Sequence, residues 1–308
     1  MSSLRSALQR YVAMRRGLGH QFRSQERRLT DFVSFMEDRG AAIITYKLAL
    51  EWATLPPDRH CSWALRLSDV RGFARHLVNV EPRTEVPPIK TLPPLRRAKP
   101  YLYSDEEIQR LLAAALELPP ADGLRRWTFH CLFGLLAVTG LRISEALWMR
   151  RDDVDLEQGV LTIRDTKFGK SRLVPMHSTT QAVLLRYSAR RDEHPDRQSS
   201  PYFFVTERGR RLLLQYVYPV FWKLSRQIGL RAQTDHNGPR LHDLRHRFAV
   251  QTLLGWYRAG EDVDRRLPAL STYLGHGCVR DTYWYLSACP ELMEHAARRL
   301  EARWELRP

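Results

Sequence analysis

Apolar residues recur at helical spacing through the first 80 residues of the chain. In the segment that starts at Ser24, positions i, i+3, i+4 and i+7 are all apolar: Leu29, Phe32, Val33 and Met36. One face of a helix has this spacing, so the pattern predicts a helix with Ser24 as its N-terminal cap and Gly40 as its C-terminal stop. The pattern returns over residues 63–77. We therefore expect three or four helices in residues 1–80.

A second helical region begins just after residue 100. Ser104 and Glu107 stand three apart ahead of an apolar run, which is the capping-box signature of a helix start. The run WTFHCLFGLLAV, residues 127–138, predicts a buried helix, and Gly140 favours its end. A further helix is expected from Arg142.

The stretch GVLTIRDTKFGKSRLVPM has a different pattern. Val160, Thr162 and their neighbours are typical of a strand, KFGK is typical of a turn, and RLVPM predicts the returning strand. The chain from about residue 211 onward again has helical spacing. The predicted fold class is therefore mainly α with a small antiparallel β-sheet.

Prolines separate the two helical regions. Between residues 82 and 100 the chain has six of them: Pro82, Pro87, Pro88, Pro93, Pro94 and Pro100. Prolines at this density prevent a helix and favour an extended connector. We expect a helical domain over residues 1–85, a basic linker over 86–100 and a second domain over 101–308.

The charge of the chain indicates an acidic partner. The 308 residues carry 49 Lys and Arg against 34 Asp and Glu, for a formal charge of +15. The first 100 residues hold 18 basic and 9 acidic side chains, so the front domain is the more basic per residue. Such an excess favours nucleic acid as the partner, with an anionic membrane surface as the second choice.

The apolar stretches argue against the membrane. The longest of them, CLFGLLAV at residues 131–138, is too short to span a bilayer. The N-terminal residues lack the apolar run of a signal peptide. The four cysteines form no C-x-x-C pair, and their spacing fits no zinc ribbon. We expect a cytoplasmic protein without a membrane partner.

The motif LHDLRHRF, residues 241–248, allows two interpretations. His242 and His246 are four apart, on one face of a helix, and H-D-x-x-H is one methylene short of the zinc-protease motif H-E-x-x-H. A zinc site would need a third ligand. His242 and Arg245 are three apart, again on one helical face. That pair suits a phosphate better than a metal.

Other polar residues interrupt apolar patterns, and together they fit one chemistry. They are Arg142, Glu145, Lys167, Lys170, His242, Arg245, His276, Tyr283 and Tyr285. Two arginines can stabilise the extra negative charge of a phosphodiester transition state. A tyrosine hydroxyl can be the nucleophile, a histidine its base, and a lysine the proton donor to the departing oxygen. No cluster of Asp and Glu is evident for Mg²⁺, so we expect neither a metal nor another cofactor.

These motifs, in this order and with these gaps, resemble the tyrosine recombinase (phage integrase) family. The match is carried by TGLRISEAL, a lysine in a β-hairpin, HDLRH, LGH, and a tyrosine nine residues after that last histidine. It covers residues from about 100 to 290, and the basic helical front section is similar to the family's core-binding domain. The resemblance implies a two-domain clamp on double-stranded DNA and metal-free strand exchange through a 3′-phosphotyrosine intermediate.

The resemblance also implies a role for each motif residue. Arg142 and Arg245 would hold the scissile phosphate, and Glu145 would support Arg142. His242 would act as the general acid/base, and His276 would hydrogen-bond the phosphate.

The lysine and the tyrosine each have a neighbour that competes for the role. Lys167 matches the hairpin lysine that protonates the 5′-oxygen, and Lys170 is the alternative because KFGK allows a small register slip. Tyr285 has the spacing of the nucleophile. Tyr283 would point about 200° away from it on a helix, and Tyr273 has no motif support.

The C-terminal residues form an apolar stripe at helical spacing: Met293, Ala296, Ala297, Leu300 and Trp304. One interpretation is that it packs on its own domain. The family resemblance suggests that it docks on a neighbouring protomer, in a tetramer on DNA. We expect truncation after Ser287 to leave DNA binding largely intact and to impair recombination. Accessory recombination proteins are further candidate partners.

The leading hypothesis is a site-specific DNA recombinase for the integration, excision or transposition of a mobile element, acting at the bacterial nucleoid. A type IB topoisomerase-like DNA relaxer would use similar residues. A relative that has lost catalysis would be a DNA-binding accessory protein. Substituting Phe for Tyr285 separates an enzyme from a binder, because only the enzyme needs the hydroxyl.

Overall fold

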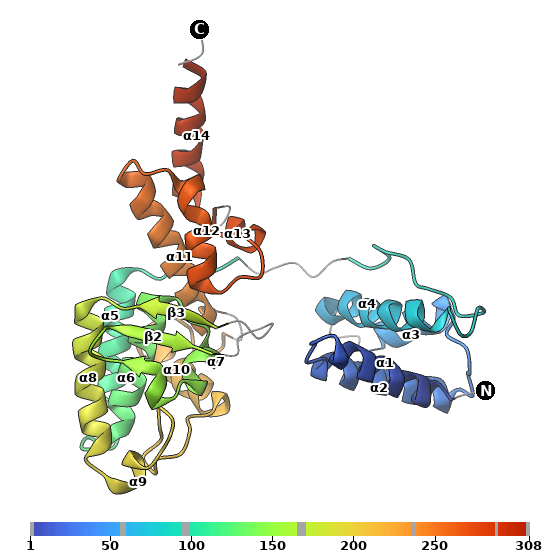
Figure 1. The fold of residues 1–308 in the computed structure, drawn as a ribbon, viewed down its shortest axis with the longest axis horizontal. Coiled ribbons are helices and arrows are strands. Elements are labelled where there is room, and N and C mark those ends of the chain that lie inside the picture. Colours follow the sequence, from blue (N-terminus) through green and yellow to red (C-terminus); the bar gives the residue numbers. More distant parts are fainter. Residues whose placement is uncertain are drawn as a thin grey trace. The chain divides into compact units, whose positions relative to one another are not determined.

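The computed structural model describes residues 3–55, 60–93, 99–164, 171–235, 238–286 and 289–305. The chain divides into two compact units, residues 1–98 and 99–308. Helices make up most of both units (Figure 1). Each unit has a hydrophobic core of its own and is described by itself.

The described part of unit 1 is a set of four helices: α1 (Leu4–Gly17), α2 (Arg23–Asp38), α3 (Tyr46–Thr54) and α4 (His60–Leu77). The apolar stripe expected on α2 is completely buried, since all of its members have 0% exposure: Leu29, Phe32, Val33 and Met36. Trp52 of α3 packs edge-on against Phe32, with ring centroids 5.1 Å apart. One apolar face per helix thus builds the core of unit 1.

The start of α2 differs from the sequence-based expectation. The helix begins at Arg23, so Ser24 lies inside it and is not its cap. The preceding residue, Phe22, is left-handed at φ 51° and only 8% exposed. Its ring packs edge-on against Tyr11 of α1, with centroids 5.5 Å apart. Aromatic packing against α1, and not a side-chain hydrogen bond, therefore decides where this helix begins.

Part of the proline-rich segment packs against the core of unit 1. Val86 and Leu92 pack against that core. Arg71 of α4 donates to the backbone carbonyls of Pro87 and Pro88, at 2.8 and 2.6 Å. The described residues between 86 and 92 therefore belong to unit 1 by their contacts.

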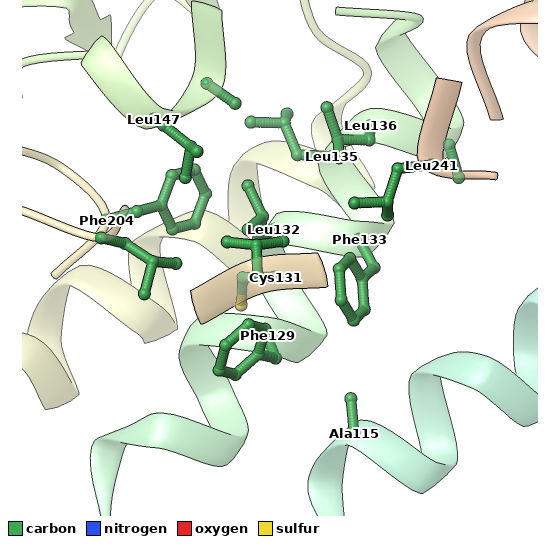
Figure 2. Close-up of a cluster of buried hydrophobic side chains, with 14 of the residues drawn as sticks. Ala115, Phe129, Cys131, Leu132, Phe133, Leu135, Leu136, Leu147, Phe204 and Leu241 are labelled. Atoms are coloured by element: carbon green, nitrogen blue, oxygen red, sulfur yellow. The ribbon is translucent and has the colours of Figure 1, made fainter. Parts of the chain in front are cut away.

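Unit 2 is larger and has a central helix. Its helices are α5 (Asp105–Leu116), α6 (Leu124–Thr139), α7 (Ile143–Trp148), the 3-10 helix η1 (Arg151–Asp153), α8 (Ser178–Asp192), α9 (Pro195–Gln198), α10 (Leu214–Gln227), α11 (Leu241–Arg258), α12 (Val263–Leu274), α13 (Arg280–Leu286) and α14 (Pro290–Glu305). Helix α6 packs against α5, α8 and α11. Figure 2 shows its side chains, among them Phe129 and Phe133, gathered with Leu147 and Phe204 in the main core.

The expected start of α5 and the expected end of α6 are confirmed, whereas α6 begins three residues before the predicted run, at Leu124. Ser104 caps α5, because its hydroxyl accepts from the backbone N–H of Glu107 at 3.1 Å. The Glu107 carboxylate accepts in return from the backbone N–H of Ser104 at 2.8 Å. Helix α6 ends at Thr139, followed by Gly140 in the left-handed region.

A small antiparallel sheet covers one side of unit 2. Its strands are β1 (Val154–Asp155), β2 (Val160–Ile163) and β3 (Arg172–Pro175), in the order β1-β2-β3. The two predicted strands are confirmed, and they pair from Val160 opposite Pro175 to Ile163 opposite Arg172. Strand β1 was not predicted. The expected turn with Lys167 and Lys170 lies outside the described residues.

A separate apolar cluster joins the last helices of unit 2. It contains buried residues from α11 to α14: Ala249, Val250, Leu253, Leu254, Val263, Leu267, Leu270, Leu274, Tyr285, Cys289 and Leu292. The predicted fold class, mainly α with a small antiparallel sheet, is confirmed. Within the described residues, the helices are all too short or too polar to span a bilayer.

Candidate active site

The junction between α6 and α7 places Arg142. Gly140 ends α6 in a left-handed conformation at φ 61°, and a side chain there would meet Phe248 at 2.6 Å. The chain then enters α7 with Arg142 as its N-cap residue. Its guanidinium Nη1 donates to Glu145 at 2.8 Å, and Nη2 donates to the carbonyl of Gly275 at 3.0 Å. The side chain is 29% exposed, so the guanidinium is held in place and still accessible to a ligand.

Glu145 is a buried carboxylate that links two arginines. Its side chain is 7% exposed, and it accepts from Arg142 and from Arg172 of β3. Arg172 reaches both carboxylate oxygens, at 3.1 and 2.8 Å. Burial alone would raise the pKa of Glu145, but the hydrogen bonds and charge of Arg172, together with the bonds from Arg142, hold that pKa below 4.5. Glu145 is therefore ionised at neutral pH.

Helix α11 carries the HDLRH motif and buries Arg245. This residue is 2% exposed, and its Nη1 and Nη2 donate to the carbonyls of Gly140 and Leu274, each at 2.7 Å. The guanidinium also interacts with the side chain of Tyr285. Burial lowers the pKa of the guanidinium below its usual value, but an arginine remains charged at neutral pH.

The turn that ends α12 is where the two motif arginines meet. The carbonyl of Leu274 accepts from Arg245 at 2.7 Å and from Arg142 at 3.5 Å, and the next carbonyl, of Gly275, accepts from Arg142. The last carbonyls of a helix have no partner within it, so they are available to these groups. Gly275 is left-handed at φ 68°, and a side chain there would meet Arg172 at 2.7 Å.

His276 follows this turn directly. Its Nδ1 lies 2.7 Å from the hydroxyl of Thr282, and its ring stacks on Tyr285 with centroids 5.8 Å apart and planes 20° apart. Burial, and then the charges of Arg245 and Arg142, lower the pKa of His276 to about 4. The ring is therefore neutral at pH 7.

The two tyrosines of α13 have opposite environments. Tyr285 is 3% exposed, whereas Tyr283 is 49% exposed. The ring of Tyr285 contacts those of His276 and His246, with centroids 5.8 and 5.2 Å away. Residues two apart on a helix face different sides. Tyr285, and not Tyr283, therefore lies with Arg245 in this site.

His242 and His246 lie edge to face on α11. Their ring centroids are 4.9 Å apart and the planes are 87° apart. His242 is exposed, yet its crowded surroundings, and then the charge of Arg245, lower its pKa below 6.5. In the part of the chain that the structure describes, no three His, Cys, Asp or Glu side chains form a group that could hold a metal ion.

Six of the residues singled out from the sequence come together in unit 2: Arg142, Glu145, His242, Arg245, His276 and Tyr285. The lysines at 167 and 170 lie outside the described residues. The structure adds two side chains that sequence reasoning missed, Arg172 and Thr282. Arg172 is two residues from buried Val174 and so shares its face of β3, but only the structure shows that this face is the buried one.

The assembled site is suited to an anion next to a hydroxyl group. Arg142, Arg172 and Arg245 bring three positive charges to this site, and the carboxylate of Glu145 balances one of them. The hydroxyl of Tyr285 interacts with one of these guanidinium groups. Arginine binds phosphate oxygens through paired N–H groups.

Sequence comparison places this arrangement in a known family. The phage integrase family profile matches residues 102–291, which include every described site residue. A protein of Sinorhizobium fredii named as an integrase/recombinase, y4rB, is 55% identical over 311 residues, covering 99% of this chain and 99% of that protein. The chain therefore belongs to the phage integrase family, the tyrosine-type site-specific DNA recombinases.

Solved structures show the same fold. The Tn1549 transposon integrase in complex with transposon right end DNA matches with a TM-score of 0.66 at 16% identity, over 96% of this chain and 98% of that chain. A lambda integrase tetramer bound to a Holliday junction matches with a TM-score of 0.62 at 18% identity, over 90% of this chain and 78% of that chain.

Proposed function

We propose that the protein cuts and rejoins double-stranded DNA at a specific site, with Tyr285 as the nucleophile. The observation that carries this proposal is the convergence of Tyr285 with Arg142, Arg245 and His276, which come from α7, α11 and the α12–α13 segment. A tyrosine held beside two arginines is suited to attack on a phosphodiester, because the arginines stabilise the charge of the transition state.

In the proposed cleavage step, the Tyr285 oxygen attacks the phosphorus and the bond to the 5′-oxygen breaks. The 3′-phosphate stays on the tyrosine, and a free 5′-hydroxyl results. Arg142 and Arg245 bind the non-bridging oxygens, since the five N–H donors of each guanidinium exceed the acceptors that already hold it. Attack by the 5′-hydroxyl of another strand reverses the step and rejoins the DNA.

Protons move between side chains of the same site. His242 takes the proton of the tyrosine hydroxyl as general base, and its lowered pKa keeps it neutral for that role. Lys167, or Lys170 in its place, gives a proton to the 5′-oxygen. We assign to His276 the tautomer in which Nδ1 accepts from Thr282, so that Nε2 carries a proton for the phosphate.

The relatives support a role in a mobile element. The name of y4rB is integrase/recombinase, and the Tn1549 integrase is bound to transposon DNA. We therefore propose integration, excision or transposition as the setting of the reaction. A lambda integrase tetramer is bound to a Holliday junction in its structure, which supports a tetramer of this chain on DNA. We propose accessory recombination proteins as further partners.

Covalent trapping tests the proposal. Nicked duplexes from the DNA that flanks the gene are incubated with the protein, and the adduct is digested and mapped by mass spectrometry. We expect an adduct on Tyr285 that Tyr285→Phe abolishes and that Tyr283→Phe, at an exposed position, retains. An adduct that Tyr285→Phe still forms would overturn the assignment. Equal adduct yields on unrelated duplexes would indicate a DNA relaxer without a specific site.

A further inference from the structure

We propose that Arg172 is a positioning residue for the DNA cleavage step, a role that rests on the function proposed above. Arg172 lies at the start of β3 and its side chain is 8% exposed. Within the described residues, the hydrogen bonds of the Arg172 side chain go to Glu145 and Tyr273, and not to Tyr285 or His276. Arg172 acts through the two structures that hold the phosphate-binding arginines: the carboxylate of Glu145 and the turn that ends α12.

The first of these contacts is a two-pronged ion pair with Glu145. Nη1 and Nη2 of Arg172 donate to Oε1 and Oε2, at 3.1 and 2.8 Å. Both side chains are buried, at 8% and 7% exposure, so solvent does little to weaken the pair. The planar guanidinium fits both oxygens at once, which a lysine ammonium cannot do.

This ion pair sets the orientation of the Glu145 carboxylate and the share of its charge that acts on Arg142. Nη1 of Arg142 shares the carboxylate oxygen Oε1 with Arg172, at 2.8 Å. With Arg172 present, the carboxylate is oriented and its charge is divided between two cations. Without Arg172, the whole negative charge would face Arg142, and the carboxylate could rotate. Arg142 would then be neutralised more strongly and aimed less well at a phosphate.

The second contact holds the turn. Nε of Arg172 donates to the carbonyl of Tyr273 at 2.7 Å. The next two carbonyls along the chain, at Leu274 and Gly275, accept from the motif arginines, and His276 comes immediately after. A single side chain therefore orients the carboxylate and the backbone segment that together position Arg142, Arg245 and His276.

Unit 2 offers a matched control for the loss of such contacts. Arg151 donates to both carboxylate oxygens of Asp192, at 3.0 and 2.7 Å, and to the backbone carbonyl of Gln198 at 2.9 Å. Arg172 makes the same kinds of bond, but those of Arg151 go to α8 and to the end of α9. Arg151→Lys therefore removes the same kinds of bond, from a more exposed pair at 35% and 23%, without touching the candidate active site.

The experiment compares single-turnover adduct formation by the wild type, Arg172→Lys, Arg172→Met and Arg151→Lys. We expect Arg172→Lys to slow the step about 10- to 100-fold and Arg172→Met to slow it more, with DNA affinity within about threefold of wild type. Arg151→Lys should react at the wild-type rate. An adduct that forms at an unchanged rate in Arg172→Lys would overturn the inference, even if Arg172→Met fails to fold.

Two further readouts separate positioning from general support of the fold. In a Glu145→Gln background, Arg172→Lys should change the rate less than about threefold, because the two residues act as one unit. NMR of ¹³C-labelled glutamates should show a higher pKa of Glu145 in Arg172→Lys. Additive effects, or an unchanged Glu145 titration, would contradict the inference. A wild type that forms no adduct would instead refute the proposed function.

Discussion

The imidazole of His246 is buried against two other rings. The ring centroids of His242 and Tyr285 lie 4.9 and 5.2 Å from the centroid of the His246 ring. His246 is 9% exposed, and within the described structure its Nδ1 has no hydrogen-bond partner. Burial, and then the charge of His242, lower its pKa to about 4. Between about pH 4 and pH 6.5, this ring is therefore neutral in the folded protein and protonated in the unfolded chain.

Acid should therefore destabilise the protein through His246. An unfolded histidine has a pKa of about 6.5, so the stabilisation is complete above that pH and is lost as the pH falls towards 4. The loss from this residue should reach up to about 3 kcal/mol. We expect His246→Phe to reduce the dependence of the unfolding free energy on pH between 4 and 6.5, as measured by urea denaturation.

The acid dependence should not vanish in that variant. His276 also has a pKa lowered to about 4 and remains in place. A variant with the full wild-type slope would show that His246 is not the group that titrates. The matched variant His177→Phe, at an exposed cap of α8, should retain the wild-type slope.

Single residues differ in how well the sequence predicts their place. Arg142, Arg245 and Tyr285 belong to short motifs, and the family resemblance points to each by number. Arg172 belongs to no such motif. The strand RLVP has an apolar residue on both faces, Leu173 with 65% exposure and Val174 with 0%. Alternation alone could not tell which face is buried, so it could not place Arg172 inside.

At the scale of elements, α14 is attached to the domain at its first turn. Cys289 and Leu292 are buried in the cluster of α11 to α13, at 8% and 1% exposure. In Figure 1 the rest of α14 extends away from the other helices of unit 2. Truncation after Ser287 would therefore remove core side chains together with any docking surface, and point substitutions separate the two effects better.

Leu292 and Met293 are neighbours with opposite exposure, 1% and 57%. We expect Leu292→Ala to lower the free energy of unfolding by about 2–5 kcal/mol, because it leaves a cavity. Met293→Ala should change it by less than about 0.5 kcal/mol. If α14 docks on a neighbouring protomer, Met293→Ala should impair recombination while adduct formation on a nicked duplex continues.

Urea denaturation and a two-site recombination assay measure these effects. Full recombination by Met293→Ala would indicate that the exposed side of the first turn of α14 makes no important contact. Equal stability of the two variants would contradict the burial of Leu292.

Local pattern predicted most elements but not their exact ends. The capping box at Ser104 is a short-range signal, and it holds because both partners lie within one turn. The start of α2 depends instead on Phe22 packing against Tyr11, eleven residues earlier in the chain. Strand β1 has only two residues, too few for any alternation to show. Contacts between distant segments decide such cases.

At the scale of the whole molecule, the net charge of +15 should control DNA affinity. Each phosphate contact releases a counterion, so a protein with 6–10 of them loses roughly 10³- to 10⁵-fold in affinity between 50 and 200 mM salt. We expect a dependence of this size for the full chain, measured by fluorescence anisotropy on a labelled duplex. A flat response would argue against extensive contact with the DNA backbone.

The division of the chain is also partly visible in the sequence. Six prolines between residues 82 and 100 indicate where helices stop. The prolines do not reveal that Val86 and Leu92 pack on the core of unit 1. Isolated apolar residues between prolines show no helical or strand spacing from which burial could be predicted. The division into two units falls after residue 98.

The turn that ends α12 holds its arginines with main-chain oxygens, those of Leu274 and Gly275. Replacing a side chain leaves those oxygens where they are. An alanine scan would identify Leu274 only as a core leucine. It would not detect the hydrogen bond that the Leu274 carbonyl accepts from Arg245. An amide-to-ester exchange between Leu274 and Gly275, which weakens the Leu274 carbonyl as an acceptor and also removes the N–H of Gly275, would reveal it. A substitution at position 274 therefore changes the packing of the core, while the carbonyl that holds Arg245 belongs to the backbone and remains.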